Sequence, residues 1–266
     1  TFPTLFGERT TLRLFAAASH LKYPEDLQLP ADVEASLQQM SHATSGVVLV
    51  CGPSGSGKTT TAYAVLREIS RRSHGALSLM SLEDPIEVML PGVSQAQVNS
   101  SVDFDLAQGL RAMMRQDPDV ILVGEMRDLE TISLAITAAE TGHLVLGTLH
   151  TNSSPESVDR IVDAYPSEEQ KQIRVMLSSS LRAVISQTLA NRASGKGRVA
   201  IHEIMLVNPA IRNLIRERKT HQLCSPATWH SNLTQSTKRS RNDSTRTQIN
   251  LRTRLRVLGI SLPIAT

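Results

Sequence analysis

Short apolar runs alternate with segments of helical periodicity between residues 47 and 149. Apolar runs bounded by turn residues are typical of buried strands, and apolar positions at intervals of three and four predict amphipathic helices. Strands that alternate with helices favour βαβ units, so we expect an α/β fold with a mostly parallel sheet flanked by helices. The predicted strands are 47–50, 76–82, 120–123 and 143–149, and the predicted helices between them are 58–71, 104–116 and 129–141.

Helical periodicity continues after this alternating region. Ser154 precedes Pro155 and is predicted to cap a helix that runs to residue 164. Ser167 and Gln170 have the spacing of a capping box, and the apolar positions after them recur at helical intervals, so we expect one long helix through about Ala190. The remaining predicted elements are a strand over 198–205 and a short helix over 209–218.

The two ends of the chain differ from its middle. Residues 10–15 alternate between polar and apolar, which is typical of a last strand, so we expect an earlier part of that domain before Thr1. Residues 225–255 are rich in Ser, Thr, Asn, Arg and Gln, and we expect poor order there. The predicted organisation is a remnant of an N-terminal domain and its linker over 1–28, an α/β core over 29–152, a C-terminal helical part over 153–223 and an atypical, poorly ordered tail over 224–266.

Composition narrows the classes of function. The 28 Lys+Arg residues nearly balance the 25 Asp+Glu residues, and aromatic residues make up 3% of the chain, so a basic, aromatic-lined nucleic-acid groove is not favoured. Cys51 and Cys224 have no partner at the spacing of a metal site, which fits a reducing compartment. No long apolar stretch or signal-peptide pattern occurs. We therefore expect a cytoplasmic protein with no nucleic-acid partner and no direct membrane insertion.

A glycine-rich segment between the first predicted strand and its helix carries the strongest chemical signal. It matches the pattern G-x-x-x-x-G-K-[ST], in which backbone N–H groups and a helix N-terminus face phosphate oxygens. Lys58 is expected to reach the β- and γ-phosphates of a nucleotide, and the Thr59 hydroxyl to bind Mg²⁺. The alternative, a glycine turn without a ligand, is disfavoured because both flanks and all motif positions agree. The predicted binding residues are Gly52, Pro53, Ser54, Gly55, Ser56, Gly57, Lys58, Thr59 and Thr60.

Two acidic side chains follow predicted strands, where α/β proteins gather their ligand-binding groups. Glu125 comes just after strand 120–123 and is predicted to hold Mg²⁺ with Thr59, through water. Glu83 comes at the end of the preceding strand, where Pro85 fixes the turn, and is predicted to orient or deprotonate the attacking water. Helix caps or solvated turn charges are the alternative. The order of a phosphate loop followed by two acids favours the catalytic interpretation.

A histidine follows the last strand of this series. His150 comes directly after strand 143–149 and is a candidate for sensing the γ-phosphate or the attacking water. A lone histidine is more often structural, so this role depends on a family resemblance.

Four motifs in this order resemble those of the type II/IV secretion ATPases, most closely the PilT-like pilus-retraction motors, over about residues 1–223. They are a Walker A loop at 52–59, an acidic box at 81–87, a Walker B segment at 124–128 and a histidine box at 142–151. The resemblance implies a RecA-like P-loop NTPase core in which Glu83 is the catalytic glutamate and Glu125 and His150 complete the catalytic set. It also implies ATP and Mg²⁺ as ligands, a homo-hexamer, and a platform protein of the inner membrane as partner.

The subtype within this family is less sharply defined. Export and pilus-extension members carry a four-cysteine zinc insertion where this chain has a short turn at 191–198, which favours the retraction type. Residues 2–14 look more like the export type, and Arg13 matches the second of two arginines that act on the nucleotide there. A solvated edge-strand charge is the alternative for Arg13. Retraction, extension and export all stay open.

Three functions are consistent with the sequence. The first is ATP hydrolysis by a hexameric motor that drives pilus retraction or secretion. The second is a nucleotide-binding module that assembles without hydrolysis. The third, a nucleic-acid translocase with the same core, requires the basic, aromatic-bearing groove that the composition disfavours.

Overall fold

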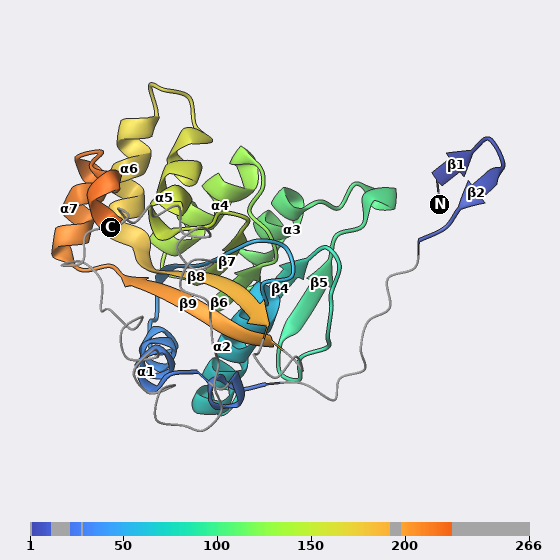
Figure 1. Cartoon of the computed structure of the whole chain (residues 1–266), viewed down its shortest axis with the longest axis horizontal. Helices are drawn as coiled ribbons and strands as arrows, with labels where there is room; N and C mark the ends of the chain where they lie inside the picture. Colours follow the sequence, from blue (N-terminus) through green and yellow to red (C-terminus); the bar gives the residue numbers. More distant parts are fainter. Residues whose placement is uncertain (1, 12–21, 28, 192–197, 225–266) are drawn as a thin grey trace, which may run out of the picture.

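The computed structural model describes residues 2–11, 22–27, 29–191 and 198–224, and a seven-stranded sheet forms the centre of this part (Figure 1). The strands lie in the order β5-β4-β6-β7-β3-β8-β9. Neighbouring strands are parallel except for β8 and β9, which are antiparallel. The bounds are β3 (Gly46–Cys51), β4 (Leu79–Glu83), β5 (Ser94–Gln97), β6 (Val120–Val123), β7 (Leu144–Leu149), β8 (Leu181–Asn191) and β9 (Arg198–Leu206).

Helices cover both faces of this sheet (Figure 1). One buried apolar cluster joins α1 (Ala31–Met40) and α2 (Lys58–Ser73) to the first face. A second cluster joins the opposite face to α3 (Leu106–Met113), α4 (Leu129–Glu140), α5 (Ser154–Asp163), α6 (Gln170–Ser180) and α7 (Pro209–Arg216). The predicted α/β fold with a mostly parallel sheet flanked by helices is confirmed.

The central strands form because their apolar runs are buried between the two layers of helices. All six residues of β3 and of β7 are buried, as are all four residues of β6. Each Val or Leu side chain buried in this way contributes ~1.5–3 kcal/mol to folding. The strands predicted at 47–50, 120–123 and 143–149 match these three elements to within one residue at each end.

Side-chain caps fix where several helices begin. The side chains of Asp128 and Asn208 accept hydrogen bonds from backbone N–H groups three residues later, at 2.8 Å for α4 and 2.9 Å for α7. In α5 the cap is Ser153, whose backbone is extended, so the predicted cap at Ser154 is wrong by one residue.

The prediction of one long helix through about Ala190 is wrong. Helix α6 ends at Ser180, and β8 follows at once and inserts between β3 and β9. Five consecutive residues, 183–187, are buried, which is the pattern of a central strand rather than of one helix face. The predicted capping box is also absent, since Ser167 donates to Glu168 and α6 begins without a side-chain cap.

The part assigned to a helical C-terminal segment, 153–223, therefore adds β8 and β9 to the central sheet. Helices α5 and α7 match the expectation, whereas α6 is shorter than predicted and β8 was not expected. The strand predicted at 198–205 agrees with β9. The domain boundaries themselves stay predictions.

Short elements complete the described chain. Strands β1 (Phe2–Thr4) and β2 (Gly7–Arg9) form an exposed antiparallel hairpin. Single-turn helices occur at η1 (Pro24–Leu27), η2 (Ser100–Val102) and η3 (Thr220–Cys224). Most of the strand predicted at 10–15, including Arg13, and nearly all of the predicted tail lie outside the described residues. Within the described ranges, no helix combines the length and the apolar character that crossing a membrane requires.

Candidate active site

The glycine-rich segment forms a tight loop between β3 and α2. Gly52, Gly55 and Gly57 have φ angles of +147°, +73° and +90°, which side-chain-bearing residues rarely adopt. A Cβ atom at Gly52 would lie 2.1 Å from the backbone oxygen of Gln187, so only glycine fits there. These conformations curl the backbone of the loop around the N-terminus of α2.

The positive charge at the N-terminus of α2 is not neutralised by a capping side chain or by an acidic residue in the first turn. Gly57 is the N-cap residue and provides no side-chain cap, and the first turn of the helix contains no acidic residue. The first N–H groups of a helix have no intrahelical acceptor and carry the positive end of the helix dipole. This end of α2 therefore suits an anion.

Lys58, the first residue of α2, is a buried cation with only 8% of its surface exposed. Its Nζ donates to the carbonyl oxygens of Gly52 at 2.8 Å and Pro53 at 3.1 Å. Burial lowers the pKa of the ammonium, and the attraction of Glu125 opposes this effect. Among the described side chains, no carboxylate lies within ion-pair distance of Lys58. A buried charge of this kind is stabilised by an anion.

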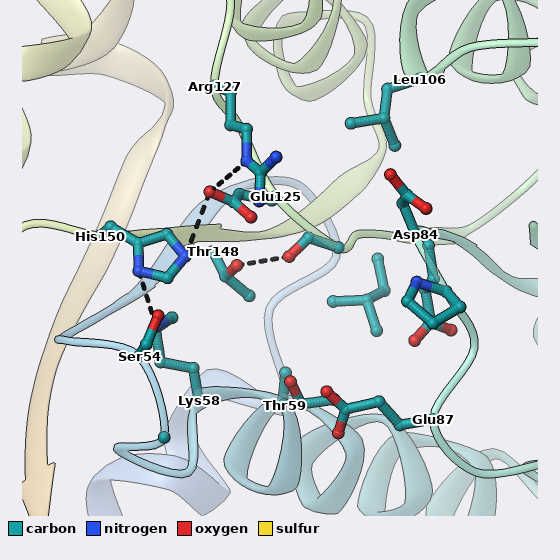
Figure 2. Close-up of a pocket in the computed structure, with 16 residues that line it drawn as sticks. Ser54, Lys58, Thr59, Asp84, Glu87, Leu106, Glu125, Arg127, Thr148 and His150 are labelled. Atoms are coloured by element: carbon teal, nitrogen blue, oxygen red, sulfur yellow. Dashed lines mark hydrogen bonds and ion pairs between the residues drawn. The ribbon is translucent and has the colours of Figure 1, made fainter. Parts of the chain in front are cut away.

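A cavity of about 550 Å³ opens in front of the loop (Figure 2). The strand ends of β4, β6 and β7 all reach it, because carboxyl ends of parallel strands meet at one edge of a sheet. The polar side chains around it that the chemistry uses are Lys58, Thr59, Glu83, Glu87, Glu125 and His150. The structure therefore brings together the loop, both predicted acids and the predicted histidine.

Glu125 follows β6 and is held by two partners. Its Oε1 atom lies 2.6 Å from Nε of Arg127 and 3.1 Å from Nε2 of His150 (Figure 2). Burial acts to raise the pKa of this carboxyl, but the hydrogen bond from Arg127 and the attraction of His150 outweigh it, so the pKa is lowered overall. Glu125 is therefore an ionised oxygen donor at the cavity.

His150 lies between the loop and Glu125. Its Nδ1 atom is 3.5 Å from Nζ of Lys58, and its Nε2 atom contacts Glu125 (Figure 2). The histidine thus contacts both the lysine of the loop and one of the predicted acids. Its predicted role as a sensor stays a prediction.

Glu83, at the end of β4, is only 3% exposed and is held on both carboxylate oxygens. Oε1 accepts from the hydroxyl of Ser81 at 2.6 Å and from the amide of Gln95 at 3.1 Å, and Oε2 accepts from the phenol of Tyr63. Burial and the hydrogen bond to Glu83 raise the pKa of Tyr63. These donors fix the orientation of the predicted base.

Of the remaining predicted residues, Thr59 lines the cavity and Thr60 and Arg13 do not belong to its lining in the described part of the chain. Thr59 and Glu87 both line the cavity (Figure 2). Thr60 is exposed and is not among the lining residues. Arg13 lies outside the described residues. The roles assigned to these residues and to the other predicted site residues stay predictions.

Some polar residues in or next to the cavity escaped the sequence-based prediction. Asp84, Glu87 and Arg127 line the cavity and flank predicted acids, so their positions in the motifs were a usable signal. Gln187 contacts the loop from β8. No signal pointed to it, because its segment has apolar spacing that also fits a helix.

The donor atoms at the cavity suit Mg²⁺ bound together with phosphates. The hydroxyl of Thr59 and the carboxylates of Glu87 and Glu125 provide oxygen atoms, which is the ligand type that Mg²⁺ takes. Within the described residues, no group of three or more His, Cys, Asp or Glu side chains is arranged to hold a metal. Phosphate oxygens would therefore supply part of the coordination.

Residues 1–196 match the model of the "Type II/IV secretion system protein" family.

Several curated proteins are similar to this chain in sequence. The "Type IV pilus retractation ATPase PilT" of Pseudomonas aeruginosa is 51% identical over 192 residues, which cover 71% of this chain and 55% of that protein. A "Twitching motility protein" of Neisseria gonorrhoeae is 48% identical over 205 residues, which cover 76% and 53%. The type II secretion protein HxcR of Pseudomonas aeruginosa is 38% identical over 245 residues, which cover 84% and 50%. The chain spans about half the length of these relatives.

Solved structures share the fold. The crystal structure of the pilus retraction motor PilT with bound ADP superposes with a TM-score of 0.72 at 40% identity, over 84% of this chain and 65% of that one. The Legionella pneumophila ATPase DotB superposes with a TM-score of 0.74 at 24% identity, over 88% and 65%. The second likeness concerns the fold alone.

Proposed function

This chain belongs to the type II/IV secretion system protein family, and we propose that it binds ATP in the cavity described above and hydrolyses it as part of a motor. Its relatives include proteins named for pilus retraction, twitching motility and type II secretion. The chain spans about half of their length, so the motor activity that these names describe comes to this chain only as part of the proposal.

One observation carries this proposal. A buried lysine without a carboxylate partner among the described residues lies at the open N-terminus of α2, and the same cavity is lined by the acids Glu83 and Glu125. The first feature suits the binding of phosphate. A hydrolase requires the second as well, because the attacking water has to be oriented and deprotonated.

The loop and α2 would hold the phosphates. Backbone N–H groups of the loop and the dipole of α2 favour the negative charge, and Lys58 adds a full positive charge. Thr59 and Glu125 would hold Mg²⁺, which neutralises charge on the phosphate oxygens when it is bound. These residues account for ATP and Mg²⁺ as ligands.

Glu83 is the proposed general base. Its carboxylate takes a proton from the attacking water as the oxygen of that water bonds to the γ-phosphorus and the bond to ADP breaks, which yields ADP and phosphate. Tyr63, Ser81 and Gln95 orient this carboxylate through their hydrogen bonds. His150 is positioned to respond to the nucleotide through its contacts with Lys58 and Glu125.

A second candidate is a module that binds nucleotide and assembles without hydrolysing it. The observation that favours it is the state of Glu83, whose two oxygens are both occupied by internal donors. A water molecule that approaches this carboxylate has to compete with these three donors for an acceptor position.

Phosphate release distinguishes the two candidates. We expect the wild-type protein to release phosphate from ATP, and Glu83→Gln to bind ATP with similar affinity while its release falls by at least 100-fold, a typical effect of removing a general base. Glu168→Gln, an exposed site outside the cavity, is the matched control and should match wild type. Equal release by wild type and Glu83→Gln would exclude Glu83 as the base, and no release by either would favour the non-hydrolysing module.

The assembly and its partners follow from the family rather than from this fold alone. We infer a homo-hexamer that works in the cytoplasm at the inner membrane, where it is held by a platform protein of a pilus or secretion machine. Sedimentation with and without a non-hydrolysable ATP analogue tests the oligomer. A single monomeric species under both conditions would contradict it for this chain.

A further inference from the structure

Gln187 on β8 is a buried polar residue that contacts the phosphate loop from behind. It is 4% exposed. Its Nε2 donates to the backbone oxygen of Ser56 at 2.7 Å. Its Oε1 accepts from the hydroxyl of Thr61 at 2.6 Å and lies 3.1 Å from Nε2 of His202. One side chain thereby connects the loop, the first turn of α2 and the neighbouring strand β9.

The backbone of Gln187 also lies against the loop. Strands β3 and β8 are parallel, with Cys51 opposite Ser186, so Gln187 lies beside the point where the loop begins. Cβ atoms built on Gly52 and Gly57 would approach the backbone oxygen and the Nε2 atom of Gln187 to 2.1 Å and 2.8 Å. Two glycines of the loop thus face this one residue.

The orientation of the Gln187 amide is determined by its neighbours. The backbone oxygen of Ser56 only accepts hydrogen bonds, so the NH₂ group of Gln187 has to face it. The Oε1 atom then faces Thr61 and His202, which both have a hydrogen to donate. Burial lowers the pKa of His202 to about 4, so this histidine is neutral at ordinary pH and adds no charge behind the loop.

Holding the Ser56 carbonyl determines where the next N–H group points. The C=O and N–H groups of a trans peptide lie in one plane and point in opposite directions. A Ser56 carbonyl directed at Gln187 therefore directs the N–H of Gly57 to the opposite side of the loop, away from Gln187. No described carbonyl or side chain accepts a hydrogen bond from this N–H.

We propose that Gln187 is a positioning residue for nucleotide binding, which fixes the Ser56–Gly57 peptide so that the Gly57 N–H is available to a phosphate oxygen. The inference rests on the proposed function, since it assigns a role in binding the same nucleotide. Gln187 itself does not reach the cavity and acts through the loop.

Gln187→Glu tests this role because its effect depends on pH. At pH 8 the ionised carboxylate has no hydrogen for Ser56 and repels its carbonyl, so the peptide should rotate and the Gly57 N–H should no longer be available to a phosphate oxygen. At pH 5.5 a buried carboxyl in this position is expected to be protonated, since burial favours the neutral acid, and its O–H group can replace the lost donor. A role that is only structural predicts that the free energy of unfolding, measured by urea denaturation at both pH values, falls and recovers in parallel with the affinity, whereas the positioning role predicts a loss of affinity in protein that remains folded.

The measurement is the affinity for ADP by calorimetry at pH 8 and pH 5.5, always as a ratio to wild type at the same pH. At pH 8 we expect Gln187→Glu to bind ADP at least about 10-fold more weakly than wild type, because a hydrogen bond to a buried group is lost. At pH 5.5 we expect its affinity for ADP to lie within about 3-fold of the wild-type value. Gln39→Glu, an exposed site on α1, adds the same charge and should match wild type at both pH values.

The other possible outcomes contradict either the positioning role of Gln187 or the proposed function. Equal affinity of wild type and Gln187→Glu at pH 8, or a loss that is the same at both pH values, would overturn the positioning role. Absence of ADP binding by wild type itself would instead overturn the proposed function. If Gln187→Glu fails to fold, Gln187→Asn, whose amide is one methylene too short to reach Ser56, should show the loss at both pH values, and unchanged affinity would overturn the role.

Discussion

Tyr63 on α2 donates a hydrogen bond from its phenol to the carboxylate of Glu83 at the end of β4. Strand β4 is separated from β3 by two other strands, so this bond connects the helix after the phosphate loop to a distant part of the sheet edge. A displacement of α2 would therefore move a donor of Glu83. The hydrogen bond thus links the helix that follows the phosphate loop directly to the proposed base.

Replacement Tyr63→Phe removes this donor and leaves a buried carboxylate oxygen without it. We expect the free energy of unfolding to fall by about 1–3 kcal/mol, the cost of an unpaired buried polar group. Urea denaturation measures it. Tyr23→Phe is the control, because the ring of Tyr23 stacks under Arg67 and Arg71 and Phe retains that stacking. Equal losses in the two variants would contradict a specific contribution of the Tyr63 hydroxyl.

The glycines of the loop provide a matched pair. In Gly52→Ala the new Cβ would lie 2.1 Å from a backbone oxygen, whereas in Gly55→Ala nothing lies within 4 Å and only the positive φ is unfavourable. We expect Gly55→Ala to cost about 1 kcal/mol and Gly52→Ala about 3 kcal/mol or more, because backbone has to move as well. Urea denaturation gives both values, and a smaller loss for Gly52→Ala than for Gly55→Ala would contradict the packing described.

Glu125 should make stability depend on acidic pH. Its pKa in the folded protein is lowered from the ordinary value of 4.5, because its interactions with Arg127 and His150 outweigh the effect of burial. The contribution to stability is therefore fully present above pH 4.5 and is lost as the pH falls through the lower folded-state value. In Glu125→Gln this part of the acid sensitivity should vanish.

Thermal melting between pH 3 and pH 6 measures the effect. The melting temperatures of wild type and Glu125→Gln should differ most near pH 6 and converge toward pH 3. Two curves that stay parallel over the whole range would show that Glu125 has no lowered pKa.

Much of the fold was predictable because buried strands and phosphate loops leave local signals. The continuous apolar run of β3 and the glycine pattern after it identify a strand, a loop and a helix within some 25 residues. The carboxyl ends of the parallel strands then predict that Glu83, Glu125 and His150 meet, and all three line the cavity. Each of these inferences uses neighbours in sequence or a general rule of sheet geometry.

The part that failed depends on long-range pairing. In 181–191 the apolar spacing fits both a helix face and a strand buried on two sides, and only pairing with β3 and β9 decides between them. Gln187 and Ser56 are 131 residues apart in sequence. Because the segment that contains Gln187 was assigned to a helix, the sequence did not predict that this residue lies beside the loop. The sequence did not predict the hydrogen-bond donors of Glu83 either, since Tyr63 and Gln95 come from elements before and after β4.

The account stands on nucleotide binding by the loop and Lys58. Calorimetric titration of the protein with ADP in the presence of Mg²⁺ tests it most directly, with Lys58→Ala as the variant and Lys219→Ala, an exposed lysine outside the cavity, as the control. We predict that wild type and Lys219→Ala bind ADP with the same affinity and that Lys58→Ala binds at least about 100-fold more weakly, since a buried charge-assisted contact is lost. Equal binding by all three proteins, or by none of them, would contradict the account.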